Sequence, residues 1–344
     1  MKAVRFYDKG DIRVEDAPEP ELEAGGLLVK VEGCAICGTD IKMYLKGNPR
    51  IKPPQVIGHE FVGEIVEVGK DAAGYEVGER ITMATSISCG SCAVCRAGFT
   101  NRCENLKPVS YDYPGAFSEY IAVPPAGVTG GNAVKVPQSL GEMAALAEPV
   151  SCAVNAQILA GVKTGDTVVV VGCGPLGAIH TQVAKANGAT RVIVTERSAN
   201  RLKLAEQLGI DEIIDASKTD AAEEVMKLTA GIGADVVMVT APAAPAQEQA
   251  LSMARKGGMI NLFASLPKGG SELKIDARLI HYRELFISGA SDSTPYHVEL
   301  AVKLLDKGLI SKNIITHRLP LEKFMDGLEL MRNEEGLKVL MKPE

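Results

Sequence analysis

A run of four consecutive valines followed at once by a glycine-rich turn constrains the fold of this 344-residue chain more than any other feature. The run 167–171 has no polar alternation, which is typical of a strand buried on both faces of a parallel sheet. The turn 172–177 (Gly-Cys-Gly-Pro-Leu-Gly) follows directly, and a helical segment over 176–187 comes next. A strand, a tight turn and a helix in this order open a βαβ unit, so the sequence predicts a doubly wound α/β domain.

Strand-like and helical segments keep alternating up to about residue 290, as such a domain requires. The expected strands are 191–195, 212–215, 235–239, 259–263 and 285–287. The expected helices are 200–208, 221–228 and 247–255.

The residues outside 149–290 have a different sequence pattern. Residues 1–148 contain short apolar runs between Gly and Pro turn signals, which predict a β-rich, barrel-like or sandwich unit. After 290, we expect a helix over 295–305 and then a tail, 314–341, of short strand-like segments that rejoins the first domain. The sequence therefore predicts a β-rich domain that is interrupted by an α/β domain over 149–290.

The glycine-rich turn has the composition of a dinucleotide-binding turn, because its glycines let the backbone approach a pyrophosphate at a helix N-terminus. Five residues are expected to face such a cofactor: Gly172, Gly174, Pro175, Leu176 and Gly177. Glu196 ends the next strand, where a carboxylate accepts hydrogen bonds from the adenosine ribose and repels a 2′-phosphate. This favours NAD over NADP, although the adjacent Arg197 could stack on adenine or pair with a 2′-phosphate. The alternative is that Glu196 binds no ligand.

Cysteines indicate a metal site. Four of the eight fall within fifteen residues: Cys89, Cys92, Cys95 and Cys103. With no secretory signal at the N-terminus, such a cluster indicates a metal rather than disulfides, and four thiolates suit a structural zinc ion. An iron–sulfur cluster is the competing interpretation, but its usual spacing ends in a three-residue gap followed by proline, and here the gap is seven residues without one. Four reduced, unligated thiols are the remaining alternative.

The charge and hydropathy of the sequence argue against a nucleic-acid-binding protein and a membrane protein. Lys plus Arg total 37 against 43 for Asp plus Glu, a net charge of −6 without a basic block, so we expect no nucleic-acid partner. No uninterrupted apolar run reaches ~18 residues, which predicts a cytoplasmic protein without a membrane partner.

Two short motifs in the first domain carry further candidate metal ligands. They are Cys37-Gly38-Thr39-Asp40 and Gly58-His59-Glu60. Cysteine, histidine and glutamate all bind zinc, and a catalytic zinc keeps one position open for substrate. A lone histidine or cysteine would more often be a packed core residue.

Taken in order along the chain, these motifs resemble the zinc-dependent medium-chain dehydrogenase/reductase superfamily, near its sorbitol, threonine and galactitol-phosphate dehydrogenases. The resemblance spans essentially the whole chain, including Ala147-Glu148-Pro149 and the tail segment 316–323. It implies a GroES-like catalytic domain (1–148, with the structural zinc loop 89–103, and 291–344) and a Rossmann domain (149–290), with the active site in the cleft between them. It also implies two zinc ions per subunit, and we expect a homo-oligomer, either a dimer or a tetramer.

Residue by residue, the resemblance implies that Cys37 and His59 are the two firm ligands of a catalytic zinc. Glu60 is similar to a glutamate that binds the metal in some states and withdraws in others. Glu148 is similar to the polyol dehydrogenases' glutamate, which ligates zinc or holds its bound water, so the third ligand stays open between Glu60 and Glu148. Thr39 resembles the hydroxyl residue that passes the substrate proton toward solvent.

The implied reaction is hydride transfer between a secondary alcohol, such as a polyol, and NAD, with zinc lowering the pKa of the bound alcohol. A phosphorylated polyol or a hydroxy amino acid such as threonine is the alternative substrate. A zinc-free quinone-type reductase and a non-catalytic NAD-binding protein are the remaining alternatives, and the intact ligand motifs argue against both.

The chain also departs from these relatives. Lys42 stands where many of them carry histidine, and the loop 290–295 lacks the Arg-Tyr pair of sorbitol dehydrogenases, which puts sorbitol in doubt. Lys42, Lys46, Arg50 and Lys52 could receive an anionic substrate group, but a solvated surface is the more ordinary interpretation.

Overall fold

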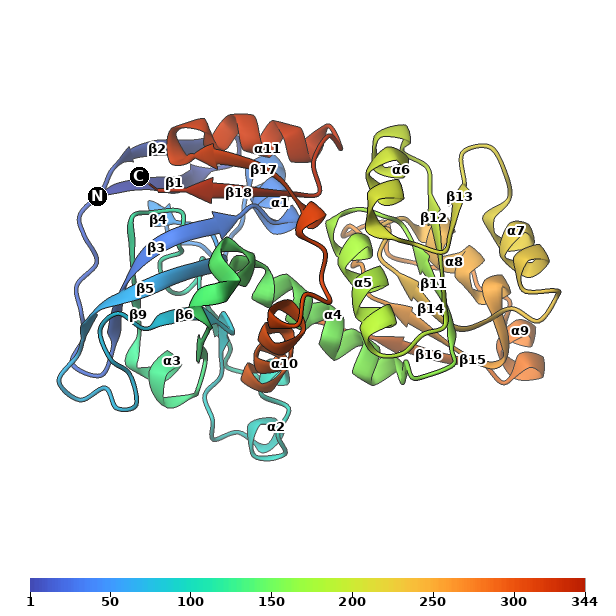
Figure 1. Cartoon of the computed structure of the whole chain (residues 1–344), viewed down its shortest axis with the longest axis horizontal. Coiled ribbons are helices and arrows are strands. Elements are labelled where there is room, and N and C mark those ends of the chain that lie inside the picture. The colour runs from blue at the N-terminus through green and yellow to red at the C-terminus, as the bar shows by residue number, and fades with distance from the viewer. Residues whose placement is uncertain (344) are drawn as a thin grey trace. The chain divides into compact units, whose positions relative to one another are not determined.

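The computed structural model describes residues 1–343, which form two compact units (Figure 1). The first unit contains Met1–Ser151, Asp292–Lys307 and the segment from Ile315 onward; the second contains Cys152–Ser291 and Gly308–Ile314. The segment 308–314 therefore differs from the expectation, which assigned all of 291–344 to the first domain. The side-chain amide of Asn313 holds it there by donating to the backbone carbonyl of Gln207 (3.2 Å).

The second unit is built on a six-stranded sheet in which every neighbouring pair is parallel, in the order β13-β12-β11-β14-β15-β16. The strands are β11 (Thr167–Val171), β12 (Arg191–Glu196), β13 (Glu212–Asp215), β14 (Ala234–Val239), β15 (Ala254–Leu262) and β16 (Phe286–Gly289). Val168, Val169 and Val170 in the central strand are 0% exposed, as a strand covered on both faces requires. This order and direction confirm the doubly wound α/β fold.

Helices connect these strands. They are α4 (Ala147–Ala160), α5 (Pro175–Ala186), α6 (Ala199–Ala205), α7 (Ala221–Leu228), α8 (Ala244–Met253) and α9 (Ala277–Arg283), with α4 beginning in the first unit. Side-chain caps start three of them, since Ser198 accepts from the Arg201 amide, Asp220 from the Glu223 amide and Asp276 from the Arg278 amide. The sequence located α5 to α8 but missed α4 and α9.

The first unit contains a larger mixed sheet and two smaller sheets. The large sheet runs β10-β6-β5-β3-β18-β17, with β9 also pairing β3, and the others are β2-β1-β4 and β7-β8. The strands are β1 (Lys2–Asp8), β2 (Asp11–Asp16), β3 (Leu27–Ala35), β4 (Gln55–Val56), β5 (Glu60–Val68), β6 (Arg80–Met83), β7 (Ser86–Ile87), β8 (Lys107–Pro108), β9 (Tyr120–Val123), β10 (Ala133–Lys135), β17 (Ile315–Pro320) and β18 (Lys338–Lys342). The C-terminal strand β18 pairs antiparallel with β3, aligning Leu340 with Ala35, so the tail completes the sheet that begins near the N-terminus.

Helices accompany these strands, although the sequence predicted mainly β structure here. They are α1 (Gly38–Lys46), α2 (Ala93–Arg96), α3 (Pro125–Thr129), α10 (Pro295–Asp306) and α11 (Phe324–Arg332). The strand-like segments predicted over 314–341 are present as β17 and β18, and α11, which the sequence analysis did not predict, lies between them. Phe324, Leu328 and Met331 recur at helical spacing and are buried, so this segment gains its apolar contacts as a helix.

One stretch passes a simple length and hydropathy test for a membrane-spanning helix. It covers Gln138–Ala160, a 3₁₀ segment (Gln138–Leu146) followed by α4, and 72% of its most apolar window is buried in the structure. Such burial is typical of a core helix, so the stretch is weak evidence for a membrane.

Candidate functional site

The pairing of β3 with β5 brings together the two motifs that carry candidate metal ligands. Ala35 is aligned with Glu60, so Cys37, just beyond β3, lies near His59 and Glu60 at the start of β5. One ligand atom from each of these three residues lies within 4.8 Å of the other two. The Asp40 carboxylate accepts a hydrogen bond from the Cys37 amide (2.8 Å), which fixes the turn that holds the thiol. The geometry suits one metal ion.

The imidazole of His59 lies among negative charges. Burial alone would lower its pKa, but the charges of Cys37, Asp40 and Glu148 act in the opposite direction and raise the pKa well above the ordinary value. Its Nδ1 is buried and has no protein partner within the described residues 1–343. A buried ring nitrogen without a partner, next to a thiol and carboxylates, fits a zinc ion.

Glu60 is engaged by a buried lysine that the sequence analysis did not single out. Lys338, the first residue of β18, is 0% exposed, and its Nζ lies 2.5 Å from both carboxylate oxygens of Glu60. The same ammonium donates to the carbonyl of Ile36 (3.3 Å). The only signal in the sequence is a lysine directly before the apolar run 339–341, where a buried charge would need a partner. In this arrangement Glu60 is held by an ion pair.

Two further carboxylates act on this centre. Glu148, in the first turn of α4, is 9% exposed; it is not part of the group within 4.8 Å, but its charge contributes to the raised pKa of His59. Burial, together with the charges of Glu60 and Asp292, raises the pKa of Glu148 to about 7. Asp292 was missed by the sequence analysis; it has a left-handed backbone (φ 61°) and accepts a hydrogen bond from the Ser86 hydroxyl.

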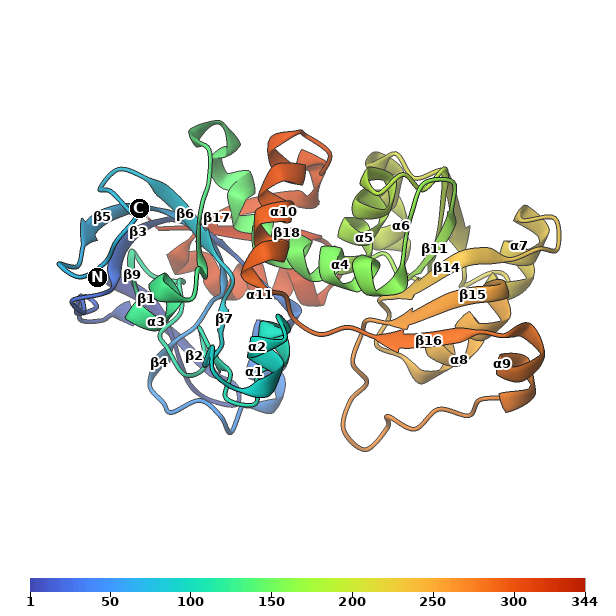
Figure 2. The same ribbon diagram turned by 90° about the horizontal axis from the view of Figure 1, so that it is seen from below.

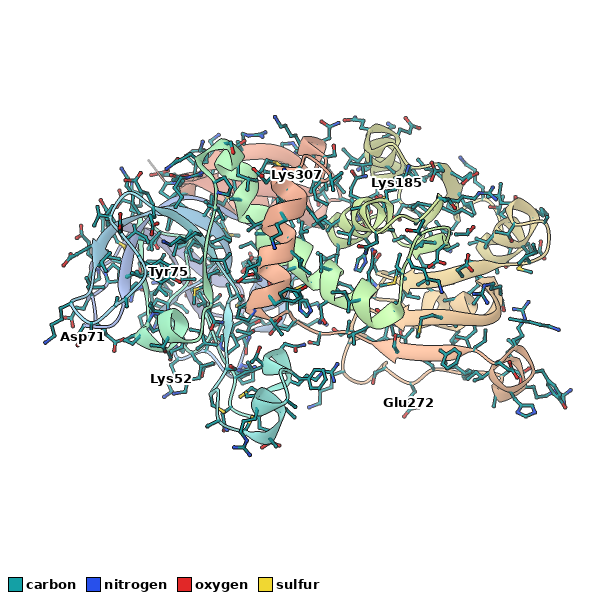
Figure 3. The ribbon with its side chains drawn as sticks, turned by 60° about the horizontal axis from the view of Figure 1, so that its bottom comes forward. Lys52, Asp71, Tyr75, Lys185, Glu272 and Lys307 are labelled. Atoms are coloured by element: carbon teal, nitrogen blue, oxygen red, sulfur yellow. The ribbon has the colours of Figure 1, made fainter. Side chains whose placement is uncertain are left out.

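Thr39 lies in the first turn of α1 and is partly exposed. Burial raises the pKa of the nearby Tyr111 phenol to about 12, and the Thr39 hydroxyl acts in the opposite direction. Arg50, from the group of four basic residues, pairs with Asp112 (3.4 Å) and lies over the Tyr111 ring. The other three, among them Lys52 (Figure 3), are also exposed, which suits the interpretation of a solvated surface.

The four clustered cysteines form a second candidate metal site. Their sulfur atoms all lie within 4.8 Å of one another, and the Cys92–Cys95 and Cys89–Cys103 pairs are separated by 3.4 and 3.5 Å. A tetrahedral zinc with Zn–S bonds of about 2.3 Å would place its sulfurs about 3.8 Å apart. Backbone hydrogen bonds from Ser91 and Cys92 lower the pKa of the Cys89 thiol to about 5, which favours the thiolate. The site fits a structural zinc.

The glycine-rich turn follows the carboxyl end of the central strand β11. Gly172 has a φ of 93°, a left-handed conformation that favours glycine. A Cβ on Gly177 would lie 2.0 Å from the Gly172 carbonyl oxygen, so only glycine fits there. Gly174 caps α5, and Pro175 begins it, where the missing proline N–H costs no hydrogen bond. The first amides of α5 are thus available to an anionic group.

Glu196 lies beside this turn and binds backbone. Its Oε2 accepts a hydrogen bond from the Cys173 amide (2.7 Å), and its Oε1 accepts from the amides of Arg197 (2.6 Å) and Ser198 (2.9 Å). Arg197 is exposed. Arg201 was missed by the sequence analysis; a Cβ on Gly174 would lie 3.4 Å from its Cζ, which places a guanidinium against the turn.

Two family models match the chain. Residues 23–138 match the alcohol dehydrogenase GroES-like domain, and residues 175–307 match the zinc-binding dehydrogenase model.

Relatives with known names match nearly the full length. The L-threonine 3-dehydrogenase of Bacillus licheniformis is 36% identical over 334 residues, which cover 96% of this chain and 94% of the relative. Among solved structures, a zinc-binding dehydrogenase from Sinorhizobium meliloti bound to NADP is 34% identical, with a TM-score of 0.92 and 99% of both chains covered. The 2R,3R-butanediol dehydrogenase from Bacillus subtilis is 29% identical, with a TM-score of 0.89, and covers 100% of this chain and 99% of its own.

The Glu60–Lys338 pair leads to a prediction about stability. We expect Lys338→Met to lower the free energy of unfolding by about 3–5 kcal/mol, because it leaves the Glu60 charge buried without its partner. Lys342→Met on the same strand removes an exposed lysine and should change stability by less than about 1 kcal/mol. Urea denaturation followed by circular dichroism measures both. Adding Glu60→Gln to Lys338→Met should restore part of the loss, and equal stability of the two lysine variants would show that the pair is dispensable.

Proposed function

The chain belongs to the zinc-dependent medium-chain dehydrogenase/reductase superfamily, and we propose that it oxidises a secondary alcohol carrying a polar group on the adjacent carbon, with NAD as hydride acceptor. Its family makes it an oxidoreductase that acts on CH–OH donors with NAD(P), and a small-molecule alcohol is its substrate. The observation that carries the finer proposal is the buried, unpartnered Nδ1 of His59 beside Cys37 and Glu60.

We assign the catalytic zinc to Cys37, His59 and Glu148, because the ammonium of Lys338 occupies both oxygens of Glu60. When bound, zinc supplies Lewis acidity that lowers the pKa of a coordinated hydroxyl, and NAD supplies a carbon that accepts hydride. The hydroxyl of Thr39 relays the substrate proton toward solvent, because it accepts that proton as it releases its own. The ion pair with Lys338 holds the Glu60 carboxylate near the proposed zinc as a negative charge, so Glu60 is not needed as a zinc ligand.

Two carboxylates support a substrate with a hydrogen-bond donor next to the reacting carbon. Asp292 lies close enough to Glu148 for its charge to raise the pKa of that carboxyl, and two carboxylates disfavour an anionic group. A vicinal diol or polyol meets this requirement through its second hydroxyl. A hydroxy amino acid such as threonine meets it through its ammonium group, and the 36% identical relative is named for that substrate, so threonine is the second candidate. A phosphorylated polyol suits these carboxylates less well.

NAD is our proposed cofactor even though the Sinorhizobium meliloti relative binds NADP. The Glu196 carboxylate is fixed next to the glycine-rich turn by three backbone amides, where it would repel a 2′-phosphate. Arg201 supplies a positive charge for the cofactor's phosphates on the other side of the turn.

We also propose a cytoplasmic homo-oligomer. None of the eight cysteines forms a disulfide, which is typical of a reducing compartment. Strand β16 lies at one edge of its sheet, with α9 nearby (Figure 2). On β16, Phe286 (60%) and Ile287 (40%) are exposed, and Tyr282 on α9 is 65% exposed. An apolar edge strand of this kind suits pairing with the same strand of a second copy.

The experiment that tests the proposed function is a screen of NADH formation with 2R,3R-butanediol, L-threonine, sorbitol, galactitol 1-phosphate and ethanol. We expect the substrates with an adjacent hydroxyl or ammonium group to exceed ethanol in kcat/KM by about 100-fold or more, because a site built for that group is left unpaired without it. No NADH from any of these alcohols, in protein that contains zinc, would contradict the proposal.

A second prediction concerns metal content. We expect two zinc ions per subunit by elemental analysis of carefully purified protein. Cys37→Ser should lose one zinc and at least about 100-fold in kcat while unfolding near the wild-type temperature. Cys95→Ser should instead lose the other zinc and unfold at a lower temperature, because a structural zinc contributes folding free energy. One zinc or none in the wild type would contradict this assignment.

A third prediction concerns the cofactor. We expect the wild type to prefer NAD over NADP by about 100-fold in kcat/KM, since a carboxylate facing a phosphate costs several kcal/mol. Glu196→Ser should narrow or reverse this preference. Glu212→Ser on β13 removes a carboxylate that pairs with Arg191 and serves as the control that should leave the preference unchanged. Equal use of NAD and NADP by the wild type would disprove the role of Glu196.

A further inference from the structure

The two residues at which the chain returns to the first unit, Asp292 and Ser293, are fixed by hydrogen bonds. The Asp292 carboxylate accepts one from the Ser86 hydroxyl on β7 and another from the Ser293 amide (2.7 Å). Asp292 has a φ of 61°, a left-handed conformation that a residue with a Cβ rarely adopts. Such a conformation persists only where the surroundings impose it. The loop is therefore held against β7, and this places the side chain of Ser293.

The hydroxyl of Ser293 meets the first turns of α4. Its Oγ lies 2.6 Å from the Oγ of Ser151, which in turn lies 2.6 Å from the backbone carbonyl oxygen of Glu148. A carbonyl only accepts and a hydroxyl has one hydrogen, so Ser151 donates to Glu148 while Ser293 donates to Ser151. Ser151 is 0% and Ser293 3% exposed. Two buried hydrogen bonds in series therefore join the loop to the backbone that carries the Glu148 carboxylate.

Glu148 is the one proposed zinc ligand that the paired strands do not place. Cys37 follows β3 and His59 precedes β5, and their ligand atoms lie within 4.8 Å of each other. Glu148 lies in the first turn of α4 and is not part of that group. Its carboxylate reaches a metal through a flexible side chain, so the helix start that carries it must be held in place. The two hydrogen bonds supply this restraint, because a buried acceptor that loses its donor is left unsatisfied.

We infer that Ser293 is a positioning residue for Glu148 and acts on it through the hydroxyl of Ser151. This inference rests on the proposed function, in which Glu148 is the third ligand of the catalytic zinc. Two carboxylates near that zinc are then held by different means. The ion pair with Lys338 keeps Glu60 away from the metal, whereas the serine hydroxyls hold the backbone from which Glu148 reaches it. Removal of a group that orients a metal ligand typically costs about 10- to 100-fold in metal affinity.

The test compares the zinc affinity of full-length Ser293→Ala with that of Ser118→Ala. Ser118 is also in the first unit and 0% exposed, and its hydroxyl donates to the Tyr120 carbonyl (2.8 Å), so both variants lose one buried hydroxyl. Competition with a zinc chelator measures the affinity, and Cys37→Ser, which should keep only the four-cysteine zinc, identifies the signal of the catalytic site. We expect Ser293→Ala to bind the catalytic zinc about tenfold more weakly. Its four-cysteine zinc, and both zinc ions of Ser118→Ala, should be bound as in the wild type.

A double variant gives a second measurement. If Ser293 acts only through Glu148, adding Ser293→Ala to Glu148→Ala should weaken zinc binding no further than Glu148→Ala does alone. Wild-type zinc affinity in Ser293→Ala, an equal loss in Ser118→Ala, or losses that multiply in the double variant would overturn the inference while the proposed function stands. A wild type that holds no zinc at Cys37 and His59 would instead overturn the proposed function and this inference with it.

Discussion

The ion pair between Glu60 and Lys338 is the interaction on which the candidate metal centre depends. It joins the first residue of β5 to the first residue of β18, two strands that both pair with β3. Because both side chains are buried, neither charge could remain without the other. The pair therefore fixes the place of Glu60 beside Cys37 and His59, and because it engages both carboxylate oxygens of Glu60, we propose Glu148 as the third metal ligand. The charge balance of the candidate metal centre therefore depends on Lys338 in the C-terminal tail as much as on the motifs that carry Cys37 and His59.

In the second unit, the close approach of two glycines determines the shape of the glycine-rich turn. The Gly177 position lies so close to the Gly172 carbonyl that no side chain fits, and this contact brings the start of α5 against the end of β11. The Glu196 carboxylate then binds the Cys173 amide from the neighbouring strand. Charge and close packing together shape a turn that presents backbone N–H groups and a single carboxylate to the proposed dinucleotide.

Local patterns in the sequence predicted the parts of the structure that depend on local geometry. The four-valine strand and the glycine turn identified the doubly wound unit, and the cysteine spacing identified a group of four sulfurs that the fold brings together. Helix α11 was missed because its apolar positions are interrupted by a glycine and flanked by strand-like segments, and tertiary burial decided its conformation. Lys338, Asp292 and Arg201 escaped notice for another reason. Each acts through a partner distant in the sequence or through a loop whose backbone no propensity specifies, so only the folded arrangement reveals it.

The pairing of β18 with β3 has a consequence for the making of the protein. Glu60 and Lys338 are separated by 278 positions in the chain, so a ribosome adding ~5–20 residues per second finishes the lysine on the order of tens of seconds after the glutamate. During that interval the nascent first unit lacks an internal strand of its main sheet and holds an uncompensated carboxylate at its centre. Contacts of such long range are the slowest to form. The Glu60–Lys338 pair beside the candidate metal site can therefore form only after the whole dinucleotide-binding unit has been translated.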